Sequence, residues 1–148
     1  MIRMWLVRSV ILLCLNLNSS TLSIGSKFVN LYLDVFCSHH TVRLTIDSGT
    51  TGNLIRASTA IRVGANIVGC SQSAHQADGS SPLRVMGETC LVFTRGGNKL
   101  YFDGLVIENL DTDVLAGIPF MERNDASIRP AKCQIAIGGD VTFSYGSS

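Results

Sequence analysis

The feature that most restricts the fold of this chain is an alternation of apolar and polar residues with a period of two. It begins near position 26 and is clearest in two stretches separated by His39 and His40. The apolar positions that share one face are Val29, Leu31, Leu33 and Val35 in the first stretch and Val42, Leu44 and Ile46 in the second. Because successive side chains of a strand point to opposite faces, both stretches predict half-buried β-strands joined by a turn.

Shorter signals continue the β pattern toward the C-terminus. A hairpin is predicted over 91–102, where Gly96, Gly97 and Asn98 supply the positive φ angles that a tight reversal needs. Residues 105–107, 114–118 and 134–137 predict further short strands, and one short helix is predicted at about 119–125, because Pro119 is tolerated in a first helical turn. The pattern is that of an all-β domain, either a small barrel or a sandwich.

The composition supports one folded domain. The chain has 148 residues, of which 46% are hydrophobic and only 16% charged, so it is too apolar to stay disordered. Residues 26–143 are expected to form this domain, preceded by an extension over 1–25 and followed by a short tail over 144–148. The 12 basic residues nearly balance the 11 acidic ones and form no run, which argues against nucleic acid as a partner.

The first residues have the order of a signal peptide. In Met1 to Leu17, Arg3 and Arg8 precede an apolar run over 10–15 that is too short to span a bilayer, so no stable membrane span is predicted. The same segment is also consistent with an arbitrary upstream piece of a larger polypeptide. An intracellular location is preferred, and the secretory route through this segment stays open as the alternative.

Two segments far apart in the sequence hold candidates for chemistry. The second predicted strand ends in Ile46 and runs into Asp47, Ser48, Gly49 and Thr50, an acid at the start of a sharp loop. Turn formers of this kind also occur in loops with no catalytic role. The second segment is an apolar strand that contains Leu115 and Ala116 and enters the predicted helix through Gly117.

Together the two segments resemble the retropepsin family, the aspartic proteases of retroviruses and Gypsy-type retrotransposons. That family has a D-[ST]-G-[AST] loop preceded by apolar residues and, later in the chain, an apolar-apolar-Gly strand that enters a short helix. Between them, the segment that resembles the flap hairpin of retrotransposon members begins with Ala77, Asp78, Gly79 and Ser80. The resemblance extends from about position 28 to position 137, most of the expected domain.

The resemblance implies a small closed barrel of the acid-protease type with one short helix near the C-terminus. It also implies an aspartic endopeptidase that cleaves a peptide or polyprotein substrate with water activated by two aspartates, without metal or cofactor. Only one D-[ST]-G occurs in the chain, so the second aspartate must be Asp47 of another copy, and a homodimer is required. A retroelement polyprotein-processing protease is the leading hypothesis. The alternative is a catalytically inactive binding or dimerisation module with the same fold.

The resemblance also assigns roles to single residues. Asp47 is the catalytic acid, Gly49 allows a close approach of the backbone, and the Ser48 hydroxyl ties the loops of the two copies together. The Thr50 hydroxyl is expected to bond the Asp47 carboxylate, which would favour its charged form and lower the pH optimum. The strand containing Leu115, Ala116 and Gly117 supports the site, and the predicted flap excludes bulk water.

The chain departs from the family at three positions. In many viral members an acid four residues after the catalytic aspartate pairs with an arginine directly after the later glycine. Thr51 and Ile118 occupy these positions here, so both halves of the ion pair are missing together and a different brace of the dimer is expected. Ala116 is small for its position, which predicts altered core packing there.

The histidines and cysteines of the chain are better explained by structural roles than by metal or substrate binding. Cys37, His39 and His40 are close in sequence, but three candidate ligands in a turn without a fourth predict a solvated turn, so no metal site is expected. His75, which precedes the predicted flap, is expected to be exposed rather than bound to substrate. The five cysteines lack a C-x-x-C pair and are expected to be buried thiols, although the four after Cys14 could pair in a secreted protein.

Overall fold

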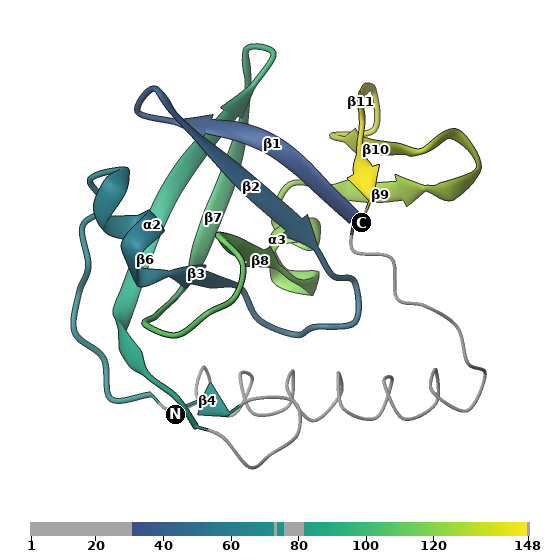
Figure 1. Ribbon diagram of the computed structural model, residues 1–148. Helices are drawn as coiled ribbons and strands as arrows, with labels where there is room; N and C mark the ends of the chain where they lie inside the picture. The colour runs from purple at the N-terminus through teal and green to yellow at the C-terminus, as the bar shows by residue number, and fades with distance from the viewer. Residues whose placement is uncertain (1–30, 73, 76–81, 148) are drawn as a thin grey trace, which may run out of the picture.

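Six strands close into a small barrel in the computed structural model, which describes residues 31–72, 74–75 and 82–147 (Figure 1). The strands are, in order around the barrel, β1 (Leu31–Cys37), β2 (His40–Ile46), β8 (Val114–Ala116), β3 (Leu54–Arg56), β7 (Asn98–Ile107) and β6 (Val85–Arg95). The pairing of Phe36 with Thr94 joins β6 back to β1 and closes the ring. The predicted extension over 1–25 lies outside the described residues.

The predicted alternation is confirmed in β1 and β2 from Leu33 onward; Leu31 is half-buried, and Val29 lies outside the described residues. Leu33 and Val35 on β1, and Val42, Leu44 and Ile46 on β2, are at most 5% exposed and belong to the main apolar core. The intervening polar residues are half-buried or exposed. Burial of one face thus fixes the register of this hairpin, because a slip of one residue would expose all five side chains.

The predicted hairpin over 91–102 is also confirmed, and it is longer than expected. Its turn consists of Gly96 and Gly97 alone, with φ of 56° and 81°, and Asn98 already belongs to β7. The separate strand predicted over 105–107 is the far end of this same long strand. The two positive φ angles explain why both turn positions are glycine.

Strand β8 lies between two strands that are neighbours in sequence. It runs parallel to β2, with Ala116 opposite Ile46, and antiparallel to β3, with Leu115 opposite Leu54. The loop over 47–53 therefore leaves β2, passes the end of β8 and enters β3. This threading brings the two candidate segments together at one end of β8.

The predicted helix is confirmed as α3 (Ile118–Arg123), which carries Pro119 in its first turn. The strand predicted over 114–118 is wrong in its last two residues, because Gly117 caps α3 and Ile118 begins it. A second helix, α2 (Ala57–Arg62), was not predicted. It has six residues and neither a side-chain cap nor an acid in its first turn, so the usual signals of a helix start are absent.

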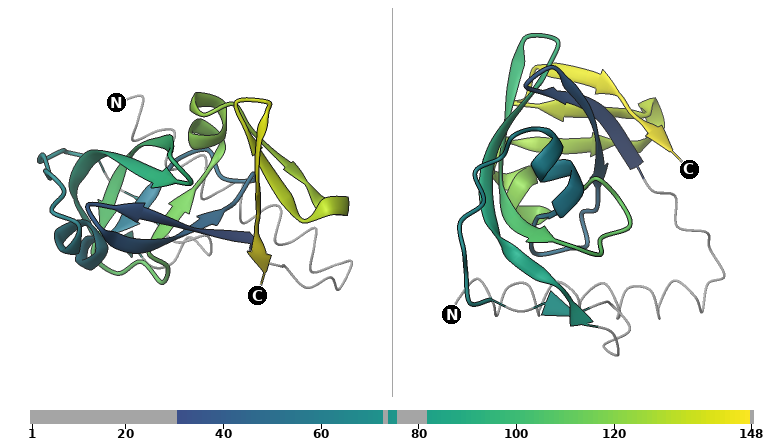
Figure 2. Two further views of the ribbon diagram at one scale, coloured as in Figure 1. Left: turned by 90° about the horizontal axis from the view of Figure 1, so that it is seen from above. Right: turned by 60° about the vertical axis from the view of Figure 1, so that its left-hand side comes forward.

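The C-terminal part forms a small sheet beside the barrel (Figure 2). Its strands are β9 (Ala126–Arg129), β10 (Gln134–Ile137) and β11 (Val141–Ser144), with a single 3-10 turn (Pro130–Lys132) between β9 and β10. The prediction for β10 is confirmed, and Ile135 and Ile137 join the main core, so this sheet shares the hydrophobic centre of the barrel. Strand β12 (Gly146–Ser147) pairs with the start of β1.

A second apolar cluster joins β4 (Ala74–His75) to the barrel. Ala74 is 1% exposed and packs with Leu54, Leu105 and Ile107 of β3 and β7. β4 pairs with β5 (Pro82–Leu83), and the predicted flap residues between them lie outside the described residues, namely Ala77, Asp78, Gly79 and Ser80. Within the described ranges, no helix has both the length and the apolar character needed to cross a bilayer.

Candidate active site

Asp47 stands directly after β2, at the start of the loop that passes β8. Its main-chain N–H donates to the carbonyl of Ala116 at 2.9 Å, which continues the pairing of β2 with β8 by one residue. Its carboxylate oxygen Oδ1 accepts the N–H of Gly49 at 2.9 Å. The acid is half-buried and Ser48 beside it is exposed, so the loop holds the carboxylate in a set direction while its tip faces solvent.

Gly117 allows the loop to pack directly on the junction of β8 and α3. A Cβ at this position would lie closer than 3.0 Å to three oxygens, the carbonyls of Gly52 and Thr50 and the hydroxyl of Thr50. The N–H of Ile118 donates to the Thr50 carbonyl at 2.7 Å. The structure thus brings the predicted loop and the predicted supporting strand into contact, with main-chain bonds on both sides of Gly117.

The expected bond from Thr50 to the Asp47 carboxylate is wrong. The Thr50 side chain is 1% exposed, and its hydroxyl donates to the main-chain carbonyl of Asp47 at 3.1 Å, with a longer contact of 3.5 Å to the carbonyl of Gly52. The side chain turns inward to satisfy buried carbonyls of its own loop. Thr50 therefore fixes the shape of the loop, and the predicted lowering of the pH optimum through this hydroxyl has no basis in the structure.

Asn53 at the end of the loop was not predicted. It is 6% exposed; its Oδ1 accepts the N–H of Gly117 at 3.0 Å and its Nδ2 donates to the carbonyl of Asp103 at 3.0 Å. In the sequence this residue looks like any other turn former between Gly52 and a strand. Nothing in its local pattern distinguishes a loop asparagine that faces solvent from one that crosses a core.

The supporting strand divides its residues between the two apolar clusters. Ala116 is fully buried in the main core, whereas Leu115 is half-buried and packs against the second cluster. Thr51 and Ile118, which replace the viral ion pair, are both half-buried. Near these two residues the loop and the β8–α3 junction are held by main-chain bonds, by the Asn53 side chain and by close packing at Gly117.

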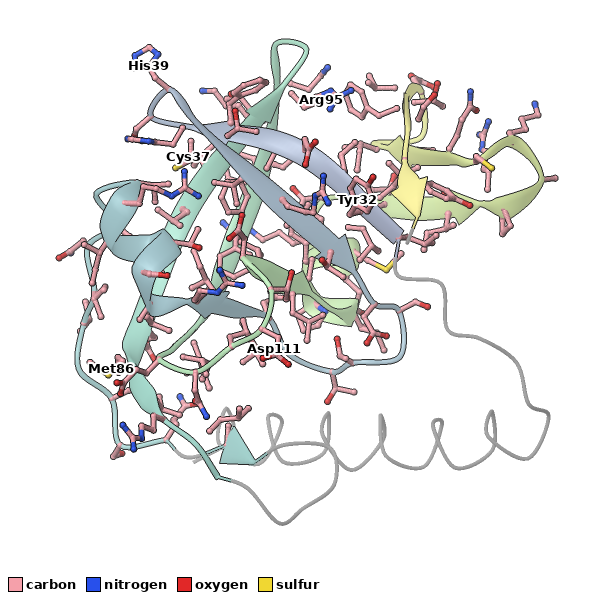
Figure 3. The ribbon with its side chains drawn as sticks, in the orientation of Figure 1. Tyr32, Cys37, His39, Met86, Arg95 and Asp111 are labelled. Atoms are coloured by element: carbon pink, nitrogen blue, oxygen red, sulfur yellow. The ribbon has the colours of Figure 1, made fainter. Side chains whose placement is uncertain are left out.

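An ion pair lies at the opposite end of β8, just before the strand begins. Asp113 Oδ1 contacts Arg56 Nη1 at 3.5 Å and accepts the Thr59 hydroxyl at 3.0 Å, while its Oδ2 accepts the N–H of Arg43 at 3.2 Å. Arg56 also donates to the carbonyls of the loop over 110–111, where Asp111 is labelled in Figure 3. These contacts fix the entry of β8 between β2 and β3.

The structure does not bring the Cys37, His39 and His40 group together as ligands. Cys37 is buried in the main core, whereas His39 lies at the tip of the β1–β2 turn and points away from the barrel (Figure 3). No group of three or more His, Cys, Asp or Glu side chains within the described residues is arranged to hold a metal ion. Cys37, Cys70 and Cys133 form no disulfide, and Cys37 is buried as expected. The expectation of buried thiols is wrong for Cys70, which is half-buried, and for Cys133, which is exposed.

Comparison with known proteins supports the fold at the level of structure. No family model matches the chain, and no curated protein matches it. The retroviral protease-like domain of Ddi1 from Leishmania major is similar, with a TM-score of 0.64 and 18% identity over 81% of this chain and 96% of that domain.

Two further solved structures overlap more loosely. The EIAV protease complexed with the inhibitor HBY-793 is 10% identical, with 66% of this chain and 90% of that protein covered and a TM-score of 0.47. A retropepsin-like aspartic protease from Rickettsia conorii is 15% identical, with 82% of this chain and 92% of that protein covered and a TM-score of 0.49. The similarity to the Leishmania domain, together with the closed barrel, shows that this chain has a retropepsin-like fold, as its motifs predict.

Proposed function

We propose that this chain is an aspartic endopeptidase whose catalytic pair forms from Asp47 of two copies. The observation that carries the proposal is the setting of Asp47, whose carboxylate accepts the Gly49 N–H at 2.9 Å in a loop packed against Gly117. The main-chain N–H of Asp47 is also bonded to the carbonyl of Ala116 on β8, a strand distant in sequence, at 2.9 Å. This arrangement holds a half-buried carboxylate near the surface, where a second one can approach it.

The chemistry follows from two carboxylates held about 3 Å apart, which share one proton because both cannot be ionised together at that distance. The ionised member takes a proton from a bound water, and this water attacks the scissile carbonyl. The protonated member donates to the carbonyl oxygen, so charge is neutralised as the tetrahedral intermediate forms. No covalent bond to the protein is made at any step.

The second carboxylate must come from another molecule, since the chain has one D-[ST]-G. Ser48 is exposed next to Asp47, so the surface around the loop is accessible to a second copy. On this proposal the two Ser48 hydroxyls tie the two loops together, and a peptide or polyprotein lies across the pair. Ala77, Asp78, Gly79 and Ser80 would close over this substrate, and a retroelement polyprotein is the natural substrate class.

The direct test is cleavage of a mixed peptide pool at about pH 4 to 6, with and without a pepstatin-like inhibitor. Asp47→Asn should lower the rate by roughly 10²–10⁴-fold, because the remaining amide neither accepts nor supplies the shared proton. Asp34→Asn is the matched control, since this acid lies on β1 in an exposed pair with Arg43. Equal cleavage by the parent and Asp47→Asn would refute the proposal.

Sedimentation over a concentration series and binding of a transition-state mimic complete the test. An active parent should bind the mimic as a dimer, whereas a strict monomer cannot assemble the pair. A dimer that binds no mimic and cleaves no peptide would support the alternative, a retropepsin-fold binding or dimerisation module without activity.

A further inference from the structure

We propose that Asn53 is a positioning residue of the catalytic loop: its buried carboxamide sets the distance between the loop and Gly117 and thereby the place of Asp47. The inference rests on the proposed function only for its effect on catalysis. The effect on the loop itself stands on geometry and can be measured separately.

The Asn53 carboxamide joins the loop to two other segments. Oδ1 accepts the N–H of Gly117 at 3.0 Å, and Nδ2 donates to the main-chain carbonyl of Asp103 on β7 at 3.0 Å. The main-chain carbonyl of Asn53 accepts the N–H of Leu105 at 3.0 Å. With the side chain 6% exposed, both branches of the amide are used and little of it is open to water.

This side chain completes a series of bonds that the loop makes to consecutive positions of the β8–α3 junction. The carbonyl of Ala116 accepts from the main chain of Asp47, and the N–H of Ile118 donates to the main chain of Thr50. The N–H of Gly117 lies between them and donates to the Asn53 side chain. Main-chain groups of the loop therefore bond Ala116 and Ile118, whereas the N–H of Gly117 between them is bonded by a side chain, that of Asn53.

Removal of the Asn53 Oδ1 acceptor would change the position of Asp47. A buried N–H left without its partner costs about 1–3 kcal/mol, so the loop and Gly117 would shift to find another acceptor or admit water. The loop cannot move closer to Gly117, because the oxygens of Thr50 and Gly52 already lie nearer to this glycine than a Cβ would allow. The same movement strains the bond from Asp47 to Ala116 and misplaces the carboxylate.

The chemistry of the site selects asparagine. One branch must accept from an N–H and the other must donate to a carbonyl, and an amide does both. An ionised aspartate could accept from Gly117 but would set a negative oxygen against the Asp103 carbonyl. A protonated aspartic acid restores both bonds, so Asn53→Asp should regain the parent loop geometry only under acidic conditions.

The chain offers a matched control in Asn124. It is 7% exposed, its Nδ2 donates to the carbonyls of Tyr101 and Phe120 at 2.9 and 2.8 Å, and its Oδ1 accepts the N–H of Tyr101 at 2.8 Å. It is thus an equally buried asparagine that bridges main-chain groups, but it follows the far end of α3. Asn53→Ala and Asn124→Ala should lower stability by similar amounts.

The first measurement is the protection of the Gly117 amide against hydrogen exchange. Each protein is measured at the same number of degrees below its own melting temperature. Asn53→Ala should lose at least about 10-fold of this protection, and Asn124→Ala should keep it. Asn53→Asp should be protected at about pH 4.5 and unprotected at about pH 7 after correction for intrinsic rates. Equal Gly117 protection in the parent and in Asn53→Ala would overturn the proposal. So would a finding that Asn53→Ala and Asn124→Ala lose the same amount of Gly117 protection.

The second measurement is the pH–rate profile of the dimeric enzyme. Asn53→Ala should lower kcat about 10- to 100-fold with little change in KM, and should narrow the pH range of activity, because a misplaced pair holds its single proton less firmly. A loss of rate that merely follows the loss of folded protein, as in Asn124→Ala, would contradict the positioning role. If the parent itself cleaves nothing, the proposed function fails, and the exchange measurement still decides the role of Asn53 in the loop.

Discussion

Gly117→Ala adds a single methyl group where the Asp47 loop packs against the β8–α3 junction. The new Cβ would lie closer than 3.0 Å to the carbonyl of Gly52, the carbonyl of Thr50 and the Thr50 hydroxyl, whereas ordinary contacts begin at 3.4 Å. Two of these oxygens belong to the main chain and cannot rotate away. The loop would have to retreat by roughly 1 Å, as expected when a methyl is forced into a filled space.

Gly117→Ala lowers the free energy of unfolding in two ways. Overpacking of this kind destabilises by about 1–3 kcal/mol. The retreat also breaks or stretches the bond from Ile118 to the Thr50 carbonyl, now 2.7 Å, which is worth about 1 kcal/mol. A total near 3 kcal/mol corresponds to a fall of about 10–15 °C in the melting temperature for a domain of this size.

Urea and thermal unfolding of the parent, Gly117→Ala and Gly69→Ala measure this cost. Gly69 is the matched control, because an added Cβ there meets nothing within 4 Å and its φ lies outside the left-handed region. On the function proposed above, the peptide-cleavage rate of Gly117→Ala should fall more than its folded fraction, since the loop that moves carries Asp47. A Gly117→Ala protein as stable as the parent would refute the close packing described for the loop.

Two further predictions concern charge and burial. Asp113→Ala should lower the free energy of unfolding by about 2 kcal/mol, because a half-buried carboxylate that accepts from Thr59 and from the main chain is lost. Asp34→Ala removes an exposed pair with Arg43 and should cost less than about 1 kcal/mol, and equal losses in urea unfolding would contradict this ranking. Burial raises the pKa of the Cys37 thiol, so in the native protein it should react with a thiol reagent at about pH 8 far more slowly than the exposed Cys133, and equal rates would count against the described core.

The fold was predictable where burial of one face imposes a regular pattern. Val35, Val42 and Leu44 are completely buried, and each occupies a position that the alternation assigned to the core. The turn at Gly96 and Gly97 was predictable for a different reason, since their φ angles are ones that glycine adopts freely. In both cases a local rule and the tertiary structure agree.

The remaining features depend on contacts that no local pattern reveals. Helix α2 has six residues, less than two turns, and owes its place to the burial of Ala57 and Ala60 in the main core. The direction of the Thr50 hydroxyl is set by buried carbonyls of its own loop, and the role of Asn53 by groups on β7 and at Gly117. The motif locates the acid in the loop, but the bonds that Thr50 and Asn53 make to hold the loop exist only in the folded protein and leave no sign in the local sequence.

The position of β8 between β2 and β3 has a consequence for the timing of assembly. The β1–β2 and β6–β7 hairpins join strands that follow one another in the chain, so each can form early, whereas the slot between β2 and β3 is filled by residues 114–116. Closing so long a loop is slow relative to forming a hairpin. A nascent chain that has not yet released β8 from the ribosome thus carries Asp47 without the Ala116 carbonyl that bonds its main chain, and the loop reaches its final form only when the barrel is nearly complete.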